Sequence, residues 1–190
     1  MRNDKGIVVV IEGPSGVGKD TLINELIASN PQLFEKAISV TTRAMREGES
    51  QGNPYDFVSN AEFEDMLNRN EIFEHTTRHG TYRGMRKNNF DKIINAKKIP
   101  LKDCDEIGLD ALKKLYPGKV FSIFITAPKE HIHARLINRG DDDNSIRIRM
   151  QDYDDKMSKT KYYDKVVQNI ELQTATNEVL DHIRTFYESV

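Results

Sequence analysis

A glycine-rich stretch near the start of the chain has the residue types and spacing of a phosphate-binding loop. Residues 13–20 read GPSGVGKD, and the pattern for such a loop is glycine, four variable residues, glycine, lysine, then serine or threonine. Its backbone N–H groups turn inward around phosphate oxygens, and its lysine reaches the β- and γ-phosphates. We therefore predict that ATP binds at Gly13, Pro14, Ser15, Gly16, Val17, Gly18, Lys19, Asp20 and Thr21.

Asp20 departs from this pattern, because a carboxylate takes the place of the hydroxyl that helps to hold Mg²⁺. One explanation is structural, since acidic residues are favoured in the first turn of a helix. The other is chemical: a carboxylate repels a triphosphate unless a cation lies between them, and Mg²⁺ prefers hard oxygen ligands. We expect Asp20 to bind Mg²⁺ directly or through water, with Thr21 supplying a hydroxyl.

The elements that must position this loop are strands and helices in alternation. Apolar runs predict buried strands at Ile7–Ile11, Ile38–Thr42 and Val120–Ile125. Helical patterns cover Thr21–Ser29, Lys129–Asn138 and Thr174–Glu188. Such alternation favours an α/β fold with a mostly parallel sheet, and the first strand leads directly into the loop, as the motif requires.

Bulk composition limits the partners. The chain has 190 residues, enough for one domain, and 28 basic against 30 acidic residues give a net charge of −2. We therefore expect no nucleic-acid or membrane partner. The single cysteine, Cys104, and the short apolar run before Glu12 indicate a cytoplasmic protein. The oligomeric state is left open.

Two polar stretches, 41–57 and 138–161, do not have the pattern of a sheet or a core. Each is either a solvated face or a mobile part of an enzyme that closes over its substrates. Residues 39–58, SVTTRAMREGESQGNPYDFV, resemble the guanylate kinase motif S-x-T-T-R-x-x-R-x-G-E-x-x-G-x-x-Y-x-F-V. This resemblance implies that Arg43, Arg46 and Tyr55 hold the phosphate of the acceptor and that Ser39 lies near its base. Independently, two arginines three residues apart can form a fork for a phosphate.

The resemblance to guanylate kinases extends from about Ile7 to the last helix. In NEIFEHTTRHGTYRGM (70–85), Glu74 matches the glutamate that reads guanine, and Tyr82 and Arg83 fall in the acceptor site. Arg83 replaces a tyrosine, and Met85 replaces a hydroxyl residue that would contact the base.

The acidic pair Asp103 and Asp105 resembles the aspartate–x–aspartate of the family. One of them would orient Mg²⁺, for which we favour Asp103, and Asp105 would lie at the base. The competing explanation is an acidic pair at the end of a strand. Pro100 and Lys102 disfavour a smooth buried strand before this pair.

The charged stretch ARLINRGDDDNSIRIRM (134–150) resembles the lid of the family. Arg135 and Arg139 are four residues apart and share a helix face. Arg149 matches a lid arginine, whereas Arg147 would point away from it. With Lys19, the arginines Arg135, Arg139 and Arg149 are the expected catalytic residues, because they would stabilise charge on the transferring phosphoryl group. YDKVVQN (163–169) places Asn169 near the adenine by the same resemblance.

These observations predict a three-layer α/β P-loop NTPase fold with an acceptor-binding insertion and a lid. The chain would be one guanylate-kinase-like domain, with a core at 1–35, 91–137 and 161–190, an acceptor-binding region at 36–90 and a lid at 138–160. The expected reaction is phosphorylation of GMP, and of dGMP, by ATP with Mg²⁺.

Two alternatives remain. The lysine–aspartate ending of the loop also resembles ribose bisphosphate phosphokinases, so ribose 1,5-bisphosphate is a rival acceptor. A non-catalytic binding module is the other alternative, although guanylate-kinase-like modules of scaffold proteins lack the loop lysine that this chain keeps as Lys19.

Overall fold

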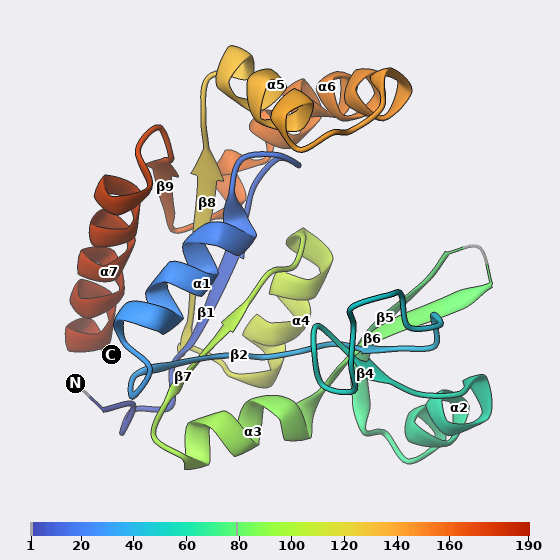
Figure 1. Ribbon diagram of the computed structural model, residues 1–190. Helices are drawn as coiled ribbons and strands as arrows, with labels where there is room; N and C mark the ends of the chain where they lie inside the picture. Colours follow the sequence, from blue (N-terminus) through green and yellow to red (C-terminus); the bar gives the residue numbers. More distant parts are fainter. Residues whose placement is uncertain (1, 79) are drawn as a thin grey trace.

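A parallel five-stranded sheet forms the centre of the computed structural model, which describes residues 2–78 and 80–190 (Figure 1). Its strand order is β2-β7-β1-β8-β9. The strands span Phe34–Lys36 (β2), Ile99–Lys102 (β7), Val8–Glu12 (β1), Val120–Thr126 (β8) and Lys165–Gln168 (β9). All four pairings are parallel, which confirms the predicted α/β class.

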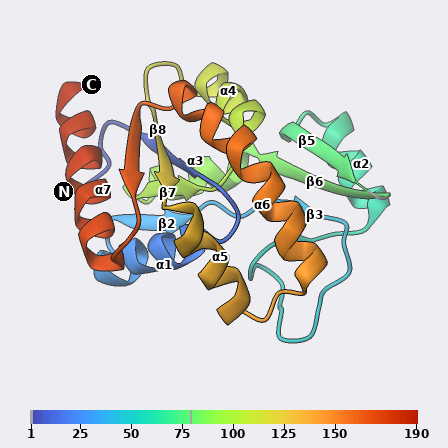
Figure 2. The ribbon, with the colours of Figure 1, turned by 90° about the horizontal axis from the view of Figure 1, so that it is seen from above.

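Helices cover both faces of this sheet and complete three layers (Figures 1 and 2). On one face, α1 (Lys19–Ser29) and α7 (Leu172–Ser189) pack on Val9 and Ile11. On the other, α3 (Lys87–Asn95) and α4 (Glu106–Leu115) pack on Val8 and Val10. Because successive side chains of a strand point to opposite faces, the unbroken apolar run of β1 fills both cores.

A second, four-stranded sheet, ordered β4-β3-β6-β5, lies to one side of the central one. Its strands are Asp56–Phe57 (β4), Val40–Thr41 (β3), Thr81–Arg86 (β6) and Ile72–Arg78 (β5), and α2 (Asn60–Asn68) covers it. Val40, Phe63 and Ile72 form a separate small core. The apolar run at Ile38–Thr42 therefore forms only a two-residue strand, which pairs with β4 and β6 and does not enter the central sheet.

Two helices, α5 (Lys129–Asn138) and α6 (Asp143–Ser158), extend beyond the carboxyl ends of β1 and β8 and are followed by a short 3₁₀ turn at Thr160–Tyr162 (Figure 1). The side chain of Asp142 caps α6 by accepting a hydrogen bond from the Ser145 N–H. Ile146 is the one buried residue of α6. The partly buried Met150 and Tyr153 of the same helix also pack against the core.

The strand β7 corrects an expectation, because Pro100 and Lys102 do not spoil it: all four of its residues are buried. Ile99 and Leu101 direct their backbone groups towards β2, since the Ile99 N–H donates to Leu33 and the Ala37 N–H donates to Leu101. The missing N–H of Pro100 therefore faces β1, which pairs with β7 only from Leu101 onward. A proline is tolerated there because no ladder bond is lost.

Within the described residues, no helix has both the length and the apolar character needed to cross a bilayer.

Candidate functional site

A cavity of about 650 Å³ opens between the phosphate loop and the second sheet. The loop side contributes Gly13, Ser15, Lys19 and Asp20. The opposite side contributes Ser39, Arg43, Tyr55, Glu74, Tyr82, Arg83 and Met85, and the residues that end and follow β7 contribute Lys102, Asp103, Cys104 and Asp105. The cavity lies beyond the carboxyl ends of parallel strands, which is where α/β sheets bind ligands.

Two glycines of the loop lie too close to neighbouring groups for any side chain. A Cβ on Gly13 would be 2.1 Å from the carbonyl oxygen of Ile125 in β8. Gly18 has a φ of 97°, and a Cβ there would be 2.7 Å from Nδ2 of Asn169. The loop can therefore rest directly on β8 and on the segment after β9 only with glycine at these positions.

Arg135 and Asn169 fix the loop from behind. Both donate to the carbonyl oxygen of Val17, each at 2.8 Å, and Arg135 also donates to the carbonyl of Asn169 at 2.8 Å. Oδ1 of Asn169 is buried and has no hydrogen-bond partner among the described residues. These two residues join α5 and the end of β9 to the backbone of the loop.

The charges of Lys19 and Glu12 act on each other beneath the loop. The Lys19 amine donates to the carbonyl oxygens of Gly13 and Pro14, the latter at 3.2 Å. Burial lowers the pKa of Lys19, against the opposing attraction of Glu12. Burial likewise raises the pKa of Glu12, although Lys19 and Lys156 act against this shift.

The sequence predictions did not include Glu12 as a site residue. The sequence feature that could have identified Glu12 is a carboxylate at the end of an apolar strand, directly before the glycine-rich loop. Lys156 of α6 pairs with Glu12 at 2.6 Å, so this carboxylate connects α6 to the base of the loop.

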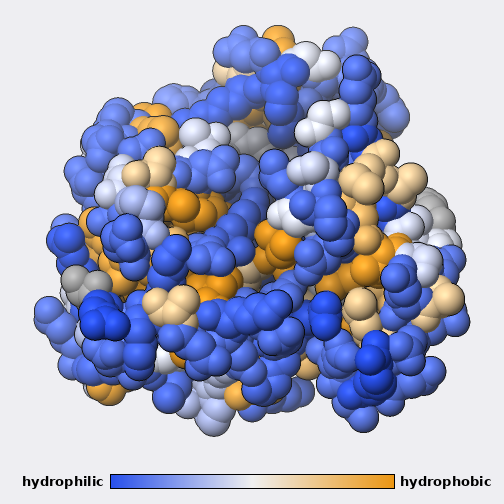
Figure 3. Space-filling model, turned by 60° about the horizontal axis from the view of Figure 1, so that its bottom comes forward, coloured by the Kyte–Doolittle hydropathy of each residue, from blue (hydrophilic) through white to orange (hydrophobic). Residues whose placement is uncertain are grey.

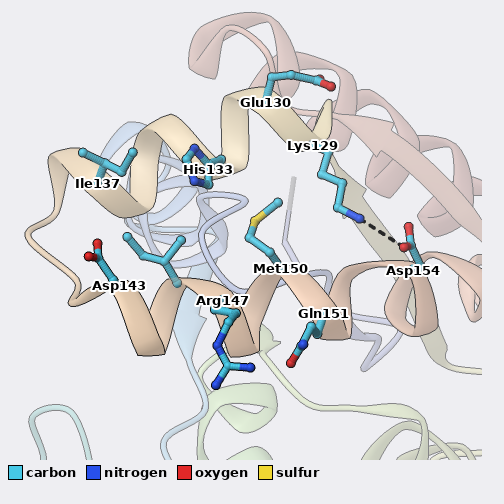
Figure 4. A pocket seen from close by; sticks show the side chains of 10 residues that line it. Lys129, Glu130, His133, Ile137, Asp143, Arg147, Met150, Gln151 and Asp154 are labelled. Carbon is cyan, nitrogen blue, oxygen red and sulfur yellow. Dashed lines mark hydrogen bonds and ion pairs between the residues drawn. The ribbon is translucent and has the colours of Figure 1, made fainter.

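Arg139 and Arg149 meet at one acidic residue, Asp141. Arg149 hydrogen-bonds the hydroxyl of Ser15 in the loop and pairs with Asp141 at 3.2 Å. Arg139 also pairs with Asp141, with its Nε at 2.7 Å. Arg147 bonds Asn144 and points away from α5 (Figure 4). Arg149 is therefore the arginine of α6 that reaches the loop.

The acceptor side of the cavity carries a cluster of Arg43, Arg83 and Tyr55. The guanidinium groups of Arg43 and Arg83 lie over the Tyr55 ring, 5.6 and 4.9 Å from its centroid. Arg43 also forms a bidentate pair with Glu49, both bonds 2.9 Å long, which raises the pKa of Arg43. The side chain of Arg46 is exposed and does not line the cavity.

Carboxylates and an aromatic ring line the far end of the cavity. Burial raises the pKa of Glu74, and repulsion from Asp105 adds to this shift. Asp105 also caps α4, because its side chain accepts a hydrogen bond from the Gly108 N–H at 3.2 Å. Tyr82 stacks on Phe63 with ring centroids 4.9 Å apart, which connects the cavity wall to the core of the second sheet.

Lys102 is a buried amine in the same wall, and it was not among the predicted site residues. The residue is 2 % exposed, and its amine donates to the hydroxyl of Ser39 at 2.5 Å. Burial lowers its pKa to about 8. The sequence feature that could have identified Lys102 is a lysine in an otherwise apolar strand, because lysine side chains are almost never fully buried without a partner.

The expected metal ligands are only partly in place. Asp20 lines the cavity but pairs with Lys36 at 3.0 Å, and its side chain is 76 % exposed. Thr21 is exposed and is not part of the cavity wall, whereas Asp103 is. Across residues 2–78 and 80–190, no three acidic, histidine or cysteine side chains gather around one point. The oxygen donors Asp20 and Asp103 fit a Mg²⁺ ion that keeps water and phosphate oxygens as its other ligands.

A second cavity lies between α5 and α6 and is separate from the loop (Figure 4). Lys129 and Asp154 pair across it at 3.0 Å, and Met150 and Ile137 line it. Elsewhere, the face seen in Figure 3 is mostly hydrophilic, with apolar side chains showing in its hollows.

A phosphate loop at the end of a parallel sheet, facing two arginines and a tyrosine across one cavity, is the organisation of a P-loop kinase. The family model described as "Guanylate kinase" matches residues 5–186. The chain therefore belongs to the guanylate kinase family.

Curated relatives and a solved structure agree with this assignment. The chain is 35 % identical over 187 residues to a guanylate kinase of Lactobacillus johnsonii, covering 97 % of this chain and 89 % of that one. It is 37 % identical over 178 residues to a guanylate kinase of Carboxydothermus hydrogenoformans, covering 92 % and 86 %. The crystal structure of guanylate kinase from Anaplasma phagocytophilum superimposes with a TM-score of 0.69 at 27 % identity, covering 95 % of this chain and 85 % of that one.

Proposed function

We propose that the protein transfers the γ-phosphoryl group of ATP to GMP, giving ADP and GDP, and that it also accepts dGMP. The observation that carries the proposal is the shared cavity, in which the phosphate loop faces the Arg43–Tyr55–Arg83 cluster. Two phosphate-binding groups in one enclosed space hold donor and acceptor in line, and such positioning supplies much of the catalysis in phosphoryl transfer.

The residues divide into three roles. The loop, with Lys19, holds the donor phosphates, while Arg135 and Asn169 keep the loop in shape and the latter lies toward the adenine. Arg43, Arg46, Tyr55 and Arg83 bind the acceptor phosphate, and Ser39, Glu74, Tyr82 and Asp105 hold its nucleoside. With Lys19, the arginines Arg135, Arg139 and Arg149 stabilise the charge on the transferred group, and Arg149 contacts the loop from the lid.

Mg²⁺ would be held by the donor phosphates together with Asp20, Thr21 and Asp103, and would neutralise phosphate charge. The proposal places the reaction in the cytoplasm, in keeping with the single cysteine. The regions 36–90 and 138–160 act as the acceptor-binding part and the lid, because the second sheet and α6 fall within them.

The test is ADP release with ATP and Mg²⁺ against GMP, dGMP, AMP, UMP, CMP, dTMP and ribose 1,5-bisphosphate. We expect turnover with GMP and dGMP. Turnover with ribose 1,5-bisphosphate alone would favour the rival acceptor. If no acceptor gave ADP release although ATP still bound, the result would favour a non-catalytic binding module.

Replacing Lys19 tests the phosphate loop. We expect Lys19→Met to lower kcat by at least about a thousandfold, because the loop lysine neutralises charge on the transferring phosphates. Circular dichroism and thermal unfolding should show an intact fold, since the amine contacts only loop carbonyls. Near-normal turnover in a folded Lys19→Met variant would contradict the assignment of this loop.

A further inference from the structure

Lys102 occupies a position in β7 from which its side chain can point only towards the acceptor side of the sheet. It pairs in parallel register with Val10, and Leu101 pairs with Val9. Val10 belongs to the core beneath α3 and α4, which also contains Met85, whereas Leu101 belongs to the opposite core. Strand alternation therefore directs Lys102 towards the second sheet.

The Lys102 amine is a hydrogen-bond donor with unused capacity. It carries three N–H groups when protonated, and among the described residues its one hydrogen-bond partner is the Ser39 hydroxyl. The residue is buried, yet it lines the cavity. Buried polar groups demand partners, so an acceptor atom of a bound ligand would be stabilised at this point.

An acceptor group, Glu74, lies within electrostatic range of this donor. The charge of Lys102 acts on the Glu74 carboxyl, and both side chains line the same cavity. Met85 lines the same wall and offers no donor, because its thioether is a weak acceptor. Its terminal methyl group instead packs on Gly108, within 3.1 Å of the position a Cβ would take there.

The hydrogen-bonding edge of guanine matches this arrangement. Guanine presents the O6 acceptor beside its N1–H and N2–H₂ donors, whereas adenine presents an N6–H₂ donor and an N1 acceptor. Glu74 suits the N1–H and N2–H₂ groups, which leaves O6 in need of a donor. Adenine in the same place would set its N6–H₂ against the amine and its N1 against the carboxylate, and such mismatches reject a ligand.

We propose that Lys102 donates a hydrogen bond to O6 of the acceptor base and thereby selects guanine, in place of a hydroxyl at position 85. This role rests on the proposed function, since it needs GMP in the cavity. Ser39 keeps the amine in position by accepting one of its hydrogen bonds.

The experiment compares GMP with 6-thio-GMP, which keeps N1–H and N2–H₂ and replaces only O6 by the weaker acceptor sulfur. In the unmodified protein, kcat/KM should be higher for GMP. In Lys102→Met, kcat/KM for GMP should fall about ten- to a hundredfold, mainly through KM, because a contact to the base is made before and during the reaction. The ratio of kcat/KM for the two substrates should approach one.

Two controls separate this role from others. Lys98→Met makes the same change beside the opposite end of β7, where Lys98 pairs with Glu35 at the surface. It should leave kcat/KM unchanged for both GMP and 6-thio-GMP. Arg43→Lys should lower kcat/KM for both substrates alike, because it alters a group assigned to the phosphate. Lys102→Leu repeats the test should the Met variant fail to fold.

An equal loss for GMP and 6-thio-GMP in Lys102→Met would overturn the inference, because the amine would then contact the phosphate or act through the fold. The inference would also be overturned if Lys102→Met turned over GMP normally and kept the ratio of kcat/KM for GMP and 6-thio-GMP found in the unmodified protein. Neither result affects the proposed function, which fails only if the unmodified protein does not phosphorylate GMP.

Discussion

The burial of an amine at Lys102 gives the stability of the protein a particular dependence on pH. The pKa is about 8 in the folded chain, against 10.5 for an ordinary lysine. Below pH 8 the amine is charged in both the folded and unfolded states, and burying the charge lowers stability by roughly 3 kcal/mol. Between pH 8 and 10.5 the unfolded state binds more protons, so this loss of stability is progressively removed as pH rises.

We therefore expect Lys102→Met to raise the free energy of unfolding at pH 7 by up to about 3 kcal/mol. The loss of the hydrogen bond between Lys102 and Ser39 reduces this gain. The gain over the unmodified chain should shrink at pH 9.5. Urea unfolding of the variant and of the unmodified protein at pH 7 and pH 9.5, with EDTA and without nucleotide, measures this difference in the free energy of unfolding. Lys98→Met serves as the control. A gain that stays constant or grows with pH would contradict the assignment of a buried amine.

At the level of single residues, the motif and the resemblance pointed to many residues that line the cavity, but they could not identify partners. Arg43, Tyr55, Glu74 and Arg83 were named from the resemblance, and all four line the cavity. That Asp20 pairs with Lys36 depends on a fold contact between distant elements, and no local pattern encodes it. The pairing of Glu12 with Lys156 is missed for the same reason.

At the level of elements, the lid arginines differ in what they reach. Arg149 and Arg147 lie on the same helix two residues apart, and only Arg149 contacts the loop. Two residues advance an α-helix by more than half a turn, so the two guanidinium groups diverge. Substituting each arginine in turn therefore separates the effect of the contact with the loop from the effect of losing a positive charge on α6.

We expect Arg149→Gln to lower kcat by about a hundredfold or more, with little change in the KM for GMP. Arg147→Gln, which loses a contact only to Asn144, should change kcat by less than about twofold. Steady-state kinetics with both substrates varied make the comparison. Equal losses in the two variants would mean that the lid acts only through its net charge.

Long periodic segments could be predicted well and short strands could not. The bounds of α5 agree with its apolar spacing and with Pro128 before it, and β8 differs from its predicted range by one residue. The strand β3 is too short to carry a pattern of its own. In β7, tertiary context overrides local preference, because the proline faces a part of β1 that does not pair with β7 and Lys102 faces a polar cavity.

At the level of the whole molecule, the second sheet has a core of its own. Val40, Phe63 and Ile72 pack there apart from the two large clusters on the central sheet. A small core contributes little stability, so this part of the chain should open before the central sheet does.

Phe63 is fully buried at the centre of that core. We expect Phe63→Ala to destabilise the second sheet by about 3–5 kcal/mol. Amide hydrogen exchange should then speed up in β3, β5 and β6 while β1 and β8 keep their protection, and ATP should still bind. The matching core variant Phe124→Ala should instead raise exchange in the central sheet. Uniform loss of protection in Phe63→Ala would show one cooperative unit.

The second sheet is inserted between two strands that are neighbours in the central sheet. Lys36 ends β2, Ile99 begins β7, and the two strands pair with each other. The insertion thus forms a closed loop of chain, whose entropic cost grows only with the logarithm of its length, about 0.6 kcal/mol for each doubling. The chain between β2 and β7 can therefore be lengthened at small entropic cost to the folding of the central sheet. The second sheet can consequently change in size while the phosphate loop keeps its support.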